Sequence, residues 1–284
     1  MNLALVARTA HGPTALFVLL WSSGALFAKA GLASASPLAF LVLRFGLALV
    51  VLLAIARLRA QAWPRAGIAV RAGASGALMI GGYSIFYLLA LDAGLTPGVL
   101  ATTLGVQPVL TLLWVERSFD WRRLGGLFIA LAGLVLVVFD SIVLSRMPAA
   151  GIAFALAALA CVTTGSVMQK RIEQPPIEVL PLQYVVSLLL CALMLPWQPW
   201  QVRWDAQLVV CVAWLGLVIS VVATLLLYRL IAAGDLVNVT SLFYLVPAGT
   251  ALLDWLVFGH RLAPLAIAGM GAIVAGLVVV FRSR

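Results

Sequence analysis

Residues 21–29 read WSSGALFAK, and residues 162–170 read VTTGSVMQK. The two stretches align without a gap at an offset of 141 residues. In each, two residues with hydroxyl side chains precede a glycine, and a lysine follows that glycine five residues later. The match indicates that the chain is a duplication of one unit. In a chain built from such repeats, a binding site is expected where the two units meet.

The composition of the chain is typical of a membrane protein. Hydrophobic residues make up 64% of its 284 positions and charged residues 10%, whereas a soluble domain contains roughly 25% charged residues. A helix of about 20 apolar residues crosses a bilayer core, and backbone exposed to lipid must satisfy its own hydrogen bonds. The apolar runs therefore predict ten transmembrane helices, at about 12–31, 37–57, 72–91, 96–116, 123–140, 149–169, 178–196, 207–229, 236–258 and 263–281.

The predicted helices divide into two repeats, residues 1–142 and residues 143–284. Five helices per repeat is an odd number, so the second repeat enters the membrane in the opposite orientation. A second correspondence supports the division, because Tyr87 precedes Pro108 in the first repeat as Tyr228 precedes Pro247 in the second. We therefore expect an all-α membrane protein with ten transmembrane helices arranged as two inverted five-helix repeats.

The distribution of basic residues predicts the orientation in the membrane. Arg44 falls within a predicted span, and four residues fall on the side opposite the termini: Lys29, Arg146, Arg203 and Arg261. The other thirteen share the side of the termini: Arg8, Arg57, Arg59, Arg65, Arg71, Arg117, Arg122, Arg123, Lys170, Arg171, Arg229, Arg282 and Arg284. By the positive-inside rule, both termini are expected in the cytoplasm. We attribute the net charge of +9 to this topology and expect no nucleic-acid partner.

The sequence gives less support to three alternatives: a cleaved signal peptide, an enzyme and a pore. A signal peptide ending at Ala33-Ser34-Ala35 would remove one copy of the repeat and leave the other unmatched. Two histidines and nine scattered acidic residues form no cluster for acid–base or metal chemistry, so we expect no enzyme, no metal and no cofactor. A pore would be lined by rings of charge or of carbonyl groups. A conductance measurement in planar bilayers would separate a pore from a carrier.

The residues resemble the drug/metabolite transporter superfamily, specifically its ten-helix EamA-type members. The motifs that carry the resemblance are residues 21–32, Leu43-Arg44-Phe45, the proline in the fourth helix of each repeat, and residues 259–264 before the last helix. The sequence departs from the family pattern at His260, where the family usually has glutamate. The resemblance implies a multi-pass carrier of the bacterial inner (plasma) membrane, with a central cavity between the halves. It also implies export of amino acids, drugs or metabolites by alternating access, and the aromatic amino-acid exporters are the subgroup that we favour.

Candidate substrate-binding residues are those that place aromatic rings, polar groups or interrupted helices near the middle of the membrane. Free backbone groups become available where glycine or proline interrupts a helix. A tyrosine hydroxyl deep in lipid would lack a partner, so these rings are expected to face protein or water. Ordinary helix packing is the alternative for each of them. The candidates are Trp21, Ser22, Tyr83, Tyr87, Gln107, Pro108, Thr163, Tyr228, Phe243, Tyr244 and Pro247.

The cavity predicted from these residues would suit a flat, largely apolar substrate, such as an aromatic amino acid. A broad-specificity drug or metabolite exporter remains the alternative. For Arg44 we favour a structural contact, with Asp254 or with a backbone carbonyl, over a contact with substrate. The predicted spans hold almost no acidic residue near their middles, so we expect a facilitator or exchanger that is not driven by protons. The partners expected are a small-molecule substrate and lipid, with the chain a monomer or a weak homodimer.

Overall fold

The computed structural model describes the chain except for residues 1–2, 59–62, 116–119, 144–146, 259–261 and 284. The side chains of residues 3–11, 254, 257 and 258 also lie outside the described part. Statements on structure below concern the remaining residues. His260 and the side chain of Asp254, both named in the sequence analysis, therefore lie outside the described residues.

Helices make up nearly all of the described structure, as the composition predicts. The first half contains α1 (Leu3–Leu32), α2 (Pro37–Leu58), α3 (Ala66–Gly76), η1 (Ala77–Gly82), α4 (Tyr83–Asp92), α5 (Pro97–Leu104), α6 (Gln107–Val115), α7 (Trp121–Val137) and α8 (Phe139–Val143). The second half contains α9 (Ala149–Lys170), α10 (Pro176–Met194), η2 (Leu195–Trp197), α11 (Ala206–Ala213), η3 (Trp214–Ala223), α12 (Thr224–Ala233), α13 (Leu236–Ser241), η4 (Leu242–Tyr244), α14 (Leu245–Phe258) and α15 (Pro264–Arg282).

Within the described residues, nine helices are long and apolar enough to cross a membrane, and the shortest of them has 18 residues. The span predicted at about 123–140 corresponds to α7, which has 17 residues and ends at Val137. It is the one predicted span that falls short of this length. The other nine predicted spans each coincide with one of the long helices.

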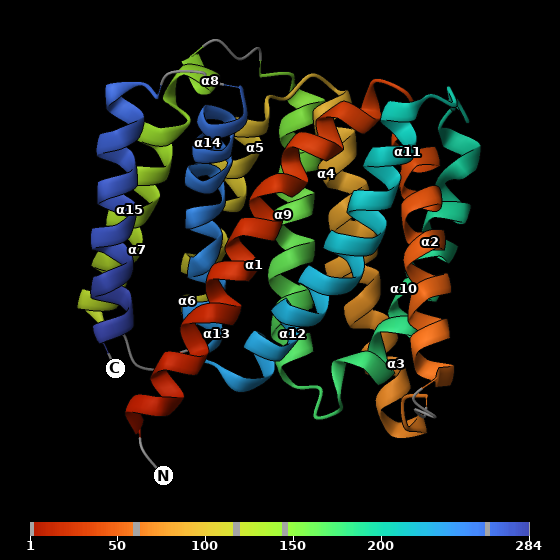
Figure 1. Ribbon diagram of the computed structural model, residues 1–284, viewed down its shortest axis with the longest axis horizontal. Coiled ribbons are helices and arrows are strands. Elements are labelled where there is room, and N and C mark those ends of the chain that lie inside the picture. Colours follow the sequence, from red (N-terminus) through yellow and green to blue (C-terminus); the bar gives the residue numbers. More distant parts are fainter. Residues whose placement is uncertain (1–2, 59–62, 116–119, 144–146, 259–261, 284) are drawn as a thin grey trace.

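The helices form an upright bundle in which sequence-distant segments lie side by side (Figure 1). The start of α1 and the end of α15 lie at the same end of the bundle in this view. The same view shows α1 and α9, which carry the two copies of the repeated sequence, running in opposite directions.

The third long helix of each half contains a π-helical segment, η1 in the first half and η3 in the second. A π-helical turn leaves the regular hydrogen-bond pattern of an α-helix and is frequent at functional sites. The segment η1 includes the Gly81-Gly82 pair at which the sequence predicts an interruption. Both interrupted helices contribute to the cavity described below.

The fourth long helix of each half is broken just before its proline. α5 ends at Leu104 and α6 begins at Gln107, so that Pro108 is the second residue of α6. In the second half the short 3₁₀ segment η4 precedes α14, and Pro247 is the third residue of α14. Proline lacks a backbone N–H and is therefore tolerated in the first turn of a helix, where that donor has no partner within the helix.

Glycines allow close contact between α7, the last long helix of the first half, and α15, the last helix of the second half. A Cβ atom on Gly133 would lie 2.6 Å from the carbonyl oxygen of Gly269. Two helical turns further along, a Cβ atom on Gly276 would lie 2.5 Å from the carbonyl oxygen of Gly126. Small residues of this kind let helix backbones touch in a membrane, where van der Waals packing drives association.

Replacing Gly133 by leucine should separate α7 from α15. Overpacking a tight contact costs about 1–3 kcal/mol, so Gly133→Leu should lower the unfolding midpoint of the detergent-purified protein. Gly125→Leu is the matched control, because a Cβ atom at this position of the same helix meets nothing within 4 Å. Equal unfolding midpoints for the two variants would contradict a close contact between α7 and α15 at Gly133.

Asp205 connects two loops at the end of the bundle opposite the termini. Its carboxylate accepts hydrogen bonds from the backbone N–H of Leu208 (2.7 Å), the hydroxyl of Ser34 (2.8 Å) and Nε of Arg203 (3.0 Å). The Leu208 N–H, followed by the Ser34 hydroxyl and the Arg203 guanidinium, lowers the pKa of this carboxyl below its ordinary value. The contact thus caps α11 and fastens it to the turn that follows α1.

The lowered pKa of Asp205 gives this contact a definite pH dependence. Because the folded pKa lies below the unfolded value of about 3.9, the stabilisation is complete above that value and is lost as the pH falls through the folded pKa. Asp205→Asn should therefore lower the unfolding midpoint at pH 7, and its difference from the native protein should shrink below about pH 4. Asp140→Asn, at an exposed carboxylate without a hydrogen bond in the described structure, should change the midpoint little at either pH.

Candidate functional site

A cavity of about 370 Å³ lies among the helices and is lined by side chains from both halves of the chain. Its walls come from α1, α2, η1, α4, α5, α6, α7 and α8 in the first half, and from α9, α10, η3, α12, η4 and α14 in the second. A volume of this size falls within the range of small-molecule binding sites in proteins.

Each copy of the repeated sequence packs against the π-helical segment of the opposite half. A Cβ atom on Gly165 of α9 would lie 2.7 Å from the backbone nitrogen of Met79 in η1. The matching Gly24 of α1 faces Ile219 in η3, where the corresponding separation is 3.9 Å. This arrangement places α1 and α9 beside the cavity and interlocks the two halves.

Hydrogen bonds fix the same two contacts. The indole Nε1 of Trp214 in η3 donates to the hydroxyl of Ser23 in α1 (2.8 Å). The hydroxyl of Ser75 in α3 donates to the carbonyl of Gly165 in α9 (3.2 Å). Ser23, a hydroxyl residue of the first copy of the repeat, and the Gly165 carbonyl of the second copy thus contribute to packing between the halves.

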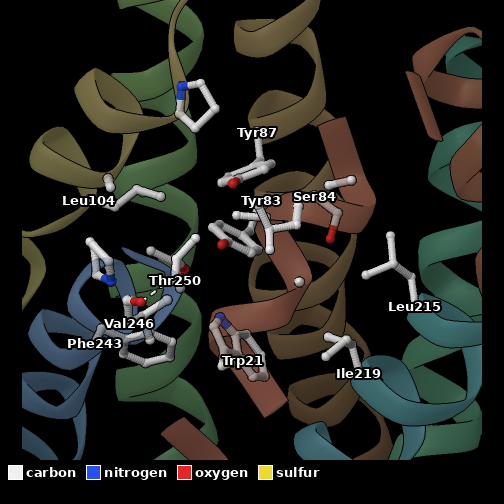
Figure 2. Close-up of a pocket in the computed structure, with 18 of the residues that line it drawn as sticks. Trp21, Tyr83, Ser84, Tyr87, Leu104, Leu215, Ile219, Phe243, Val246 and Thr250 are labelled. Atoms are coloured by element: carbon white, nitrogen blue, oxygen red, sulfur yellow. Dashed lines mark hydrogen bonds between the residues drawn. The ribbon is translucent and has the colours of Figure 1, made fainter. Parts of the chain in front are cut away.

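Aromatic side chains form much of the cavity wall. Figure 2 shows Tyr83 and Tyr87 reaching into the cavity from one helix, with Phe243 and Trp21 below them and Thr250 opposite. The centroids of the Tyr83 and Tyr87 rings are 5.7 Å apart, and those of Trp21 and Phe243 are 5.4 Å apart with the rings nearly perpendicular. Such rings offer stacking and edge-to-face contacts to a flat substrate.

A few polar groups interrupt this apolar lining. Nε2 of Gln107 lies 3.4 Å from the hydroxyl of Ser166, a residue of the repeated stretch in α9. The hydroxyl of Thr250 donates to the carbonyls of Ser22 (2.7 Å) and Val246 (3.0 Å). Tyr228 is 1% exposed, and its hydroxyl has no hydrogen-bond partner in the described structure.

Arg44 is the only charged side chain among the described residues that line the cavity. Its Nε donates to the hydroxyl of Ser220 in η3 (2.8 Å), and the hydroxyl of Tyr184 donates to the carbonyl of the same serine (2.6 Å). The sequence predicts instead a contact of Arg44 with Asp254 or with a carbonyl. The Asp254 side chain lies outside the described part, and the hydrogen bond that the structure gives Arg44 goes to a hydroxyl group.

The structure brings seven of the eleven candidate residues to the cavity: Trp21, Tyr83, Tyr87, Gln107, Tyr228, Phe243 and Pro247. Pro108, like Gln107, is buried at the start of α6, but it does not line the cavity. A role of these residues in binding substrate stays a prediction.

Three further candidates are buried in helix packing rather than in the cavity wall. The Ser22 hydroxyl donates to the carbonyl of Val18 in its own helix (2.7 Å) and packs against Gly249. Thr163 is buried, and its hydroxyl has no partner in the described structure. Tyr244 belongs to a second apolar cluster around α7 and α15, because the 3₁₀ turn of η4 directs Phe243 and Tyr244 to different neighbours.

The structure also adds cavity residues that the candidates omit: Arg44, Ser84, Tyr184, Thr224 and Thr250. A signal for Tyr184 exists in the sequence, because the 141-residue offset places it opposite Leu43, directly beside Arg44. The same offset places Thr224 opposite Tyr83, whereas no comparable signal marks Ser84. Hydroxyl residues are common in membrane helices, where they often bond backbone carbonyls.

The cavity extends toward the end of the bundle that lies opposite the termini. Pro97 and Gly98 at the start of α5, and Val138 and Ser141 after α7, belong to its lining. Figure 1 shows α8 and the start of α5 at the end opposite the two chain ends. Ser141 is exposed, which indicates that the cavity is accessible from this side.

Polar contacts join the helices at the other end of the bundle. Arg123 of α7 pairs with Asp235 and donates to the side-chain oxygen of Asn238 in α13 (2.8 Å). Nζ of Lys170 donates to the carbonyls of Ile231 and Gly234 at the end of α12 (2.7 Å each). A cation is favourable at this position because the carbonyls at a helix C-terminus are unpaired and carry partial negative charge.

Comparison with known proteins finds a family match in the second half of the chain. Residues 149–282 match the EamA-like transporter family, in agreement with the resemblance to the drug/metabolite transporter superfamily. Among solved structures, 29 chains match. One of them, titled "Crystal structure of protein", aligns with a TM-score of 0.77 and 21% identity over 96% of this chain and 97% of that chain. At this identity the likeness concerns the fold alone. No curated protein matches the chain.

Cysteine labelling should reveal the accessible end of the cavity. In a variant whose Cys161, Cys191 and Cys211 are replaced by alanine, Ser141→Cys should react rapidly with a water-soluble maleimide. Ser166→Cys, at a position that is 1% exposed, should react far more slowly. Labelling at equal rates, measured by mass spectrometry on the purified protein, would contradict an opening beside Ser141.

Proposed function

We propose that the protein is a membrane carrier that exports small molecules, principally aromatic amino acids or related metabolites, by alternating access through the central cavity. The observation that carries the proposal is a ring-lined cavity between the two halves, accessible at one end, with polar contacts between helices at the other end of the bundle. The match of residues 149–282 to the EamA-like transporter family supports transport of small molecules in general.

The proposal includes a ten-span topology with two inverted repeats and both termini in the cytoplasm. Nine long helices alone would place the termini on opposite sides of a membrane, whereas Figure 1 shows both chain ends at one end of the bundle. A crossing by α7 removes this conflict, since 17 residues is the lower end of the range observed for membrane-spanning helices. With the termini in the cytoplasm of a bacterial inner membrane, the cavity faces outward.

The aromatic substrate class rests on the character of the cavity wall. The rings of Trp21, Tyr83, Tyr87 and Phe243 supply apolar faces and edges, and a cavity of about 370 Å³ suits a molecule with one or two rings. The second candidate is a broad-specificity drug or metabolite exporter. It is favoured by the same rings, because stacking discriminates poorly among flat molecules.

We further propose that transport is not coupled to protons. Carriers driven by ion gradients place ionisable groups along the substrate path. Among the described residues that line the cavity there is no aspartate, glutamate, histidine or lysine. The carrier would then move its substrate down a gradient or exchange it for another.

Counterflow in proteoliposomes tests the proposal. Vesicles loaded with unlabelled L-phenylalanine or L-tryptophan should accumulate the same labelled amino acid, and alanine or glycine should compete weakly. Tyr83→Ala combined with Tyr87→Ala should reduce the initial rate at low substrate concentration roughly tenfold, because each aromatic contact contributes about 0.5–1.5 kcal/mol.

Phe86→Ala is the matched control for this experiment. Phe86 lies on the same helix, but its ring stacks on Phe154 of α9 rather than lining the cavity. Its rate should therefore stay near that of the native protein. Absence of counterflow with every aromatic amino acid would overturn the substrate class, and accumulation that requires an imposed pH gradient would overturn the uncoupled mechanism.

A further inference from the structure

Arg44 differs chemically from every other described side chain that lines the cavity, because it alone carries a charge. A guanidinium group has five N–H donors and no acceptor. In the described structure only one donor, on Nε, has a partner, which is the hydroxyl of Ser220. The four remaining N–H donors are without a protein partner, and the side chain is half-buried at the cavity wall.

Hydrogen bonds and a ring contact connect the residues that surround Arg44. Ser220 accepts the Arg44 hydrogen bond with its hydroxyl and the Tyr184 hydrogen bond with its carbonyl. The Tyr184 ring packs edge-on against Phe45, the residue after Arg44, with ring centroids 5.5 Å apart. The guanidinium carbon of Arg44 also lies 5.6 Å from the centroid of the Phe45 ring. In the described structure the two terminal nitrogens have no hydrogen-bond partner, which leaves them available to a ligand.

A second polar group in the cavity also lacks a partner. Tyr228 is 1% exposed, lines the cavity and shares an apolar cluster with Phe45 and Tyr184. Its hydroxyl forms no hydrogen bond in the described structure. A buried hydroxyl without a partner is unfavourable unless something else, such as a ligand, supplies the hydrogen bond.

The charge of the lining restricts which ligand can satisfy these groups. No acidic side chain lines the cavity in the described structure, so no negative charge there neutralises Arg44. The outer edge of a guanidinium matches the two oxygens of a carboxylate in a pair of parallel hydrogen bonds. One guanidinium balances one negative charge, whereas a phosphate ester with nearly two charges would require a second cation.

We propose that Arg44 binds the carboxylate of the substrate and thereby selects molecules with an apolar or aromatic body and a single carboxylate. The Tyr83 and Tyr87 rings, which line the same cavity, contact the apolar body of the substrate. An amino group on the substrate is not required for recognition. This inference rests on the proposed transport function and adds to it the charge of the substrate.

Competition against L-phenylalanine counterflow tests the inference with five matched compounds. Unlabelled L-phenylalanine and 3-phenylpropionate carry the carboxylate, whereas phenethylamine, 3-phenylpropionamide and phenyl phosphate do not. The two carboxylates should inhibit at similar concentrations. The amine, the amide and the phosphate should each need roughly 10- to 100-fold more, the range expected when hydrogen bonds to a charged group are lost.

Variants of Arg44 and Ser220 then assign the preference to the guanidinium. Arg44→Gln should remove the difference between 3-phenylpropionate and its amide, and Arg44→Lys should keep part of it, because the charge remains without the paired geometry. Ser220→Ala should largely retain the preference, since it removes the Arg44 hydrogen bond but leaves the charge. Size-exclusion profiles and unfolding midpoints establish that each variant is folded.

The outcomes separate this inference from the proposed function. If the native protein carries phenethylamine or the amide as well as the carboxylates, transport of aromatic molecules stands and the role of Arg44 is overturned. A folded Arg44→Gln variant that still prefers the carboxylate to its amide overturns it equally. If none of the compounds is carried or inhibits, the proposed function and the inference fail together.

Discussion

The packing of each repeated helix against the π-helical segment of the opposite half is the constraint on which the site depends. Gly165 admits the backbone of η1 to within contact distance of α9, whereas Gly24 contacts the side chain of Ile219 in η3. A larger side chain at Gly165 would displace η1 and with it the start of α4, where Tyr83 begins the ring-bearing face. The aromatic wall is thus positioned by backbone contact between the halves.

Because the cavity lies within membrane-spanning helices, some of its lining residues indicate more about the substrate than others do. Apolar side chains are the default in a bilayer, so aromatic lining alone distinguishes few substrates. A charged side chain within a span costs about 3 kcal/mol unless it is paired or hydrated, which makes Arg44 the most informative residue of the lining. In the described structure its guanidinium has one hydrogen-bond partner, Ser220, and lies against the Phe45 ring.

Much of the architecture could be predicted from the sequence because the membrane allows few solutions. The apolar runs correspond to nine long helices, and the breaks near Gly81-Gly82, Pro108 and Pro247 fall where backbone hydrogen bonding is interrupted. The length of α7 was harder to predict, because an apolar run continues past the point at Val137 where the helix ends.

The site was predictable only in part, because sequence position does not determine which way a side chain points. Phe243 and Tyr244 are neighbours, yet only Phe243 lines the cavity, since a 3₁₀ turn directs the two rings apart. Ser22 and Thr163, taken from the repeated stretch, are buried in helix packing. The partner of Arg44 came from a π-helical segment, a local geometry that no simple residue pattern predicts.

The glycine contacts between α7 and α15 have a mechanical consequence for how the halves can move. Carbonyl oxygens and Cα atoms meet directly along this line, so parting the two helices by the width of a methyl group would lose most of their dispersion energy. The contact of Gly165 in α9 with η1 is similarly close, so both contacts between the halves resist separation. Movement of one half against the other is therefore least restricted where it keeps both contacts closed.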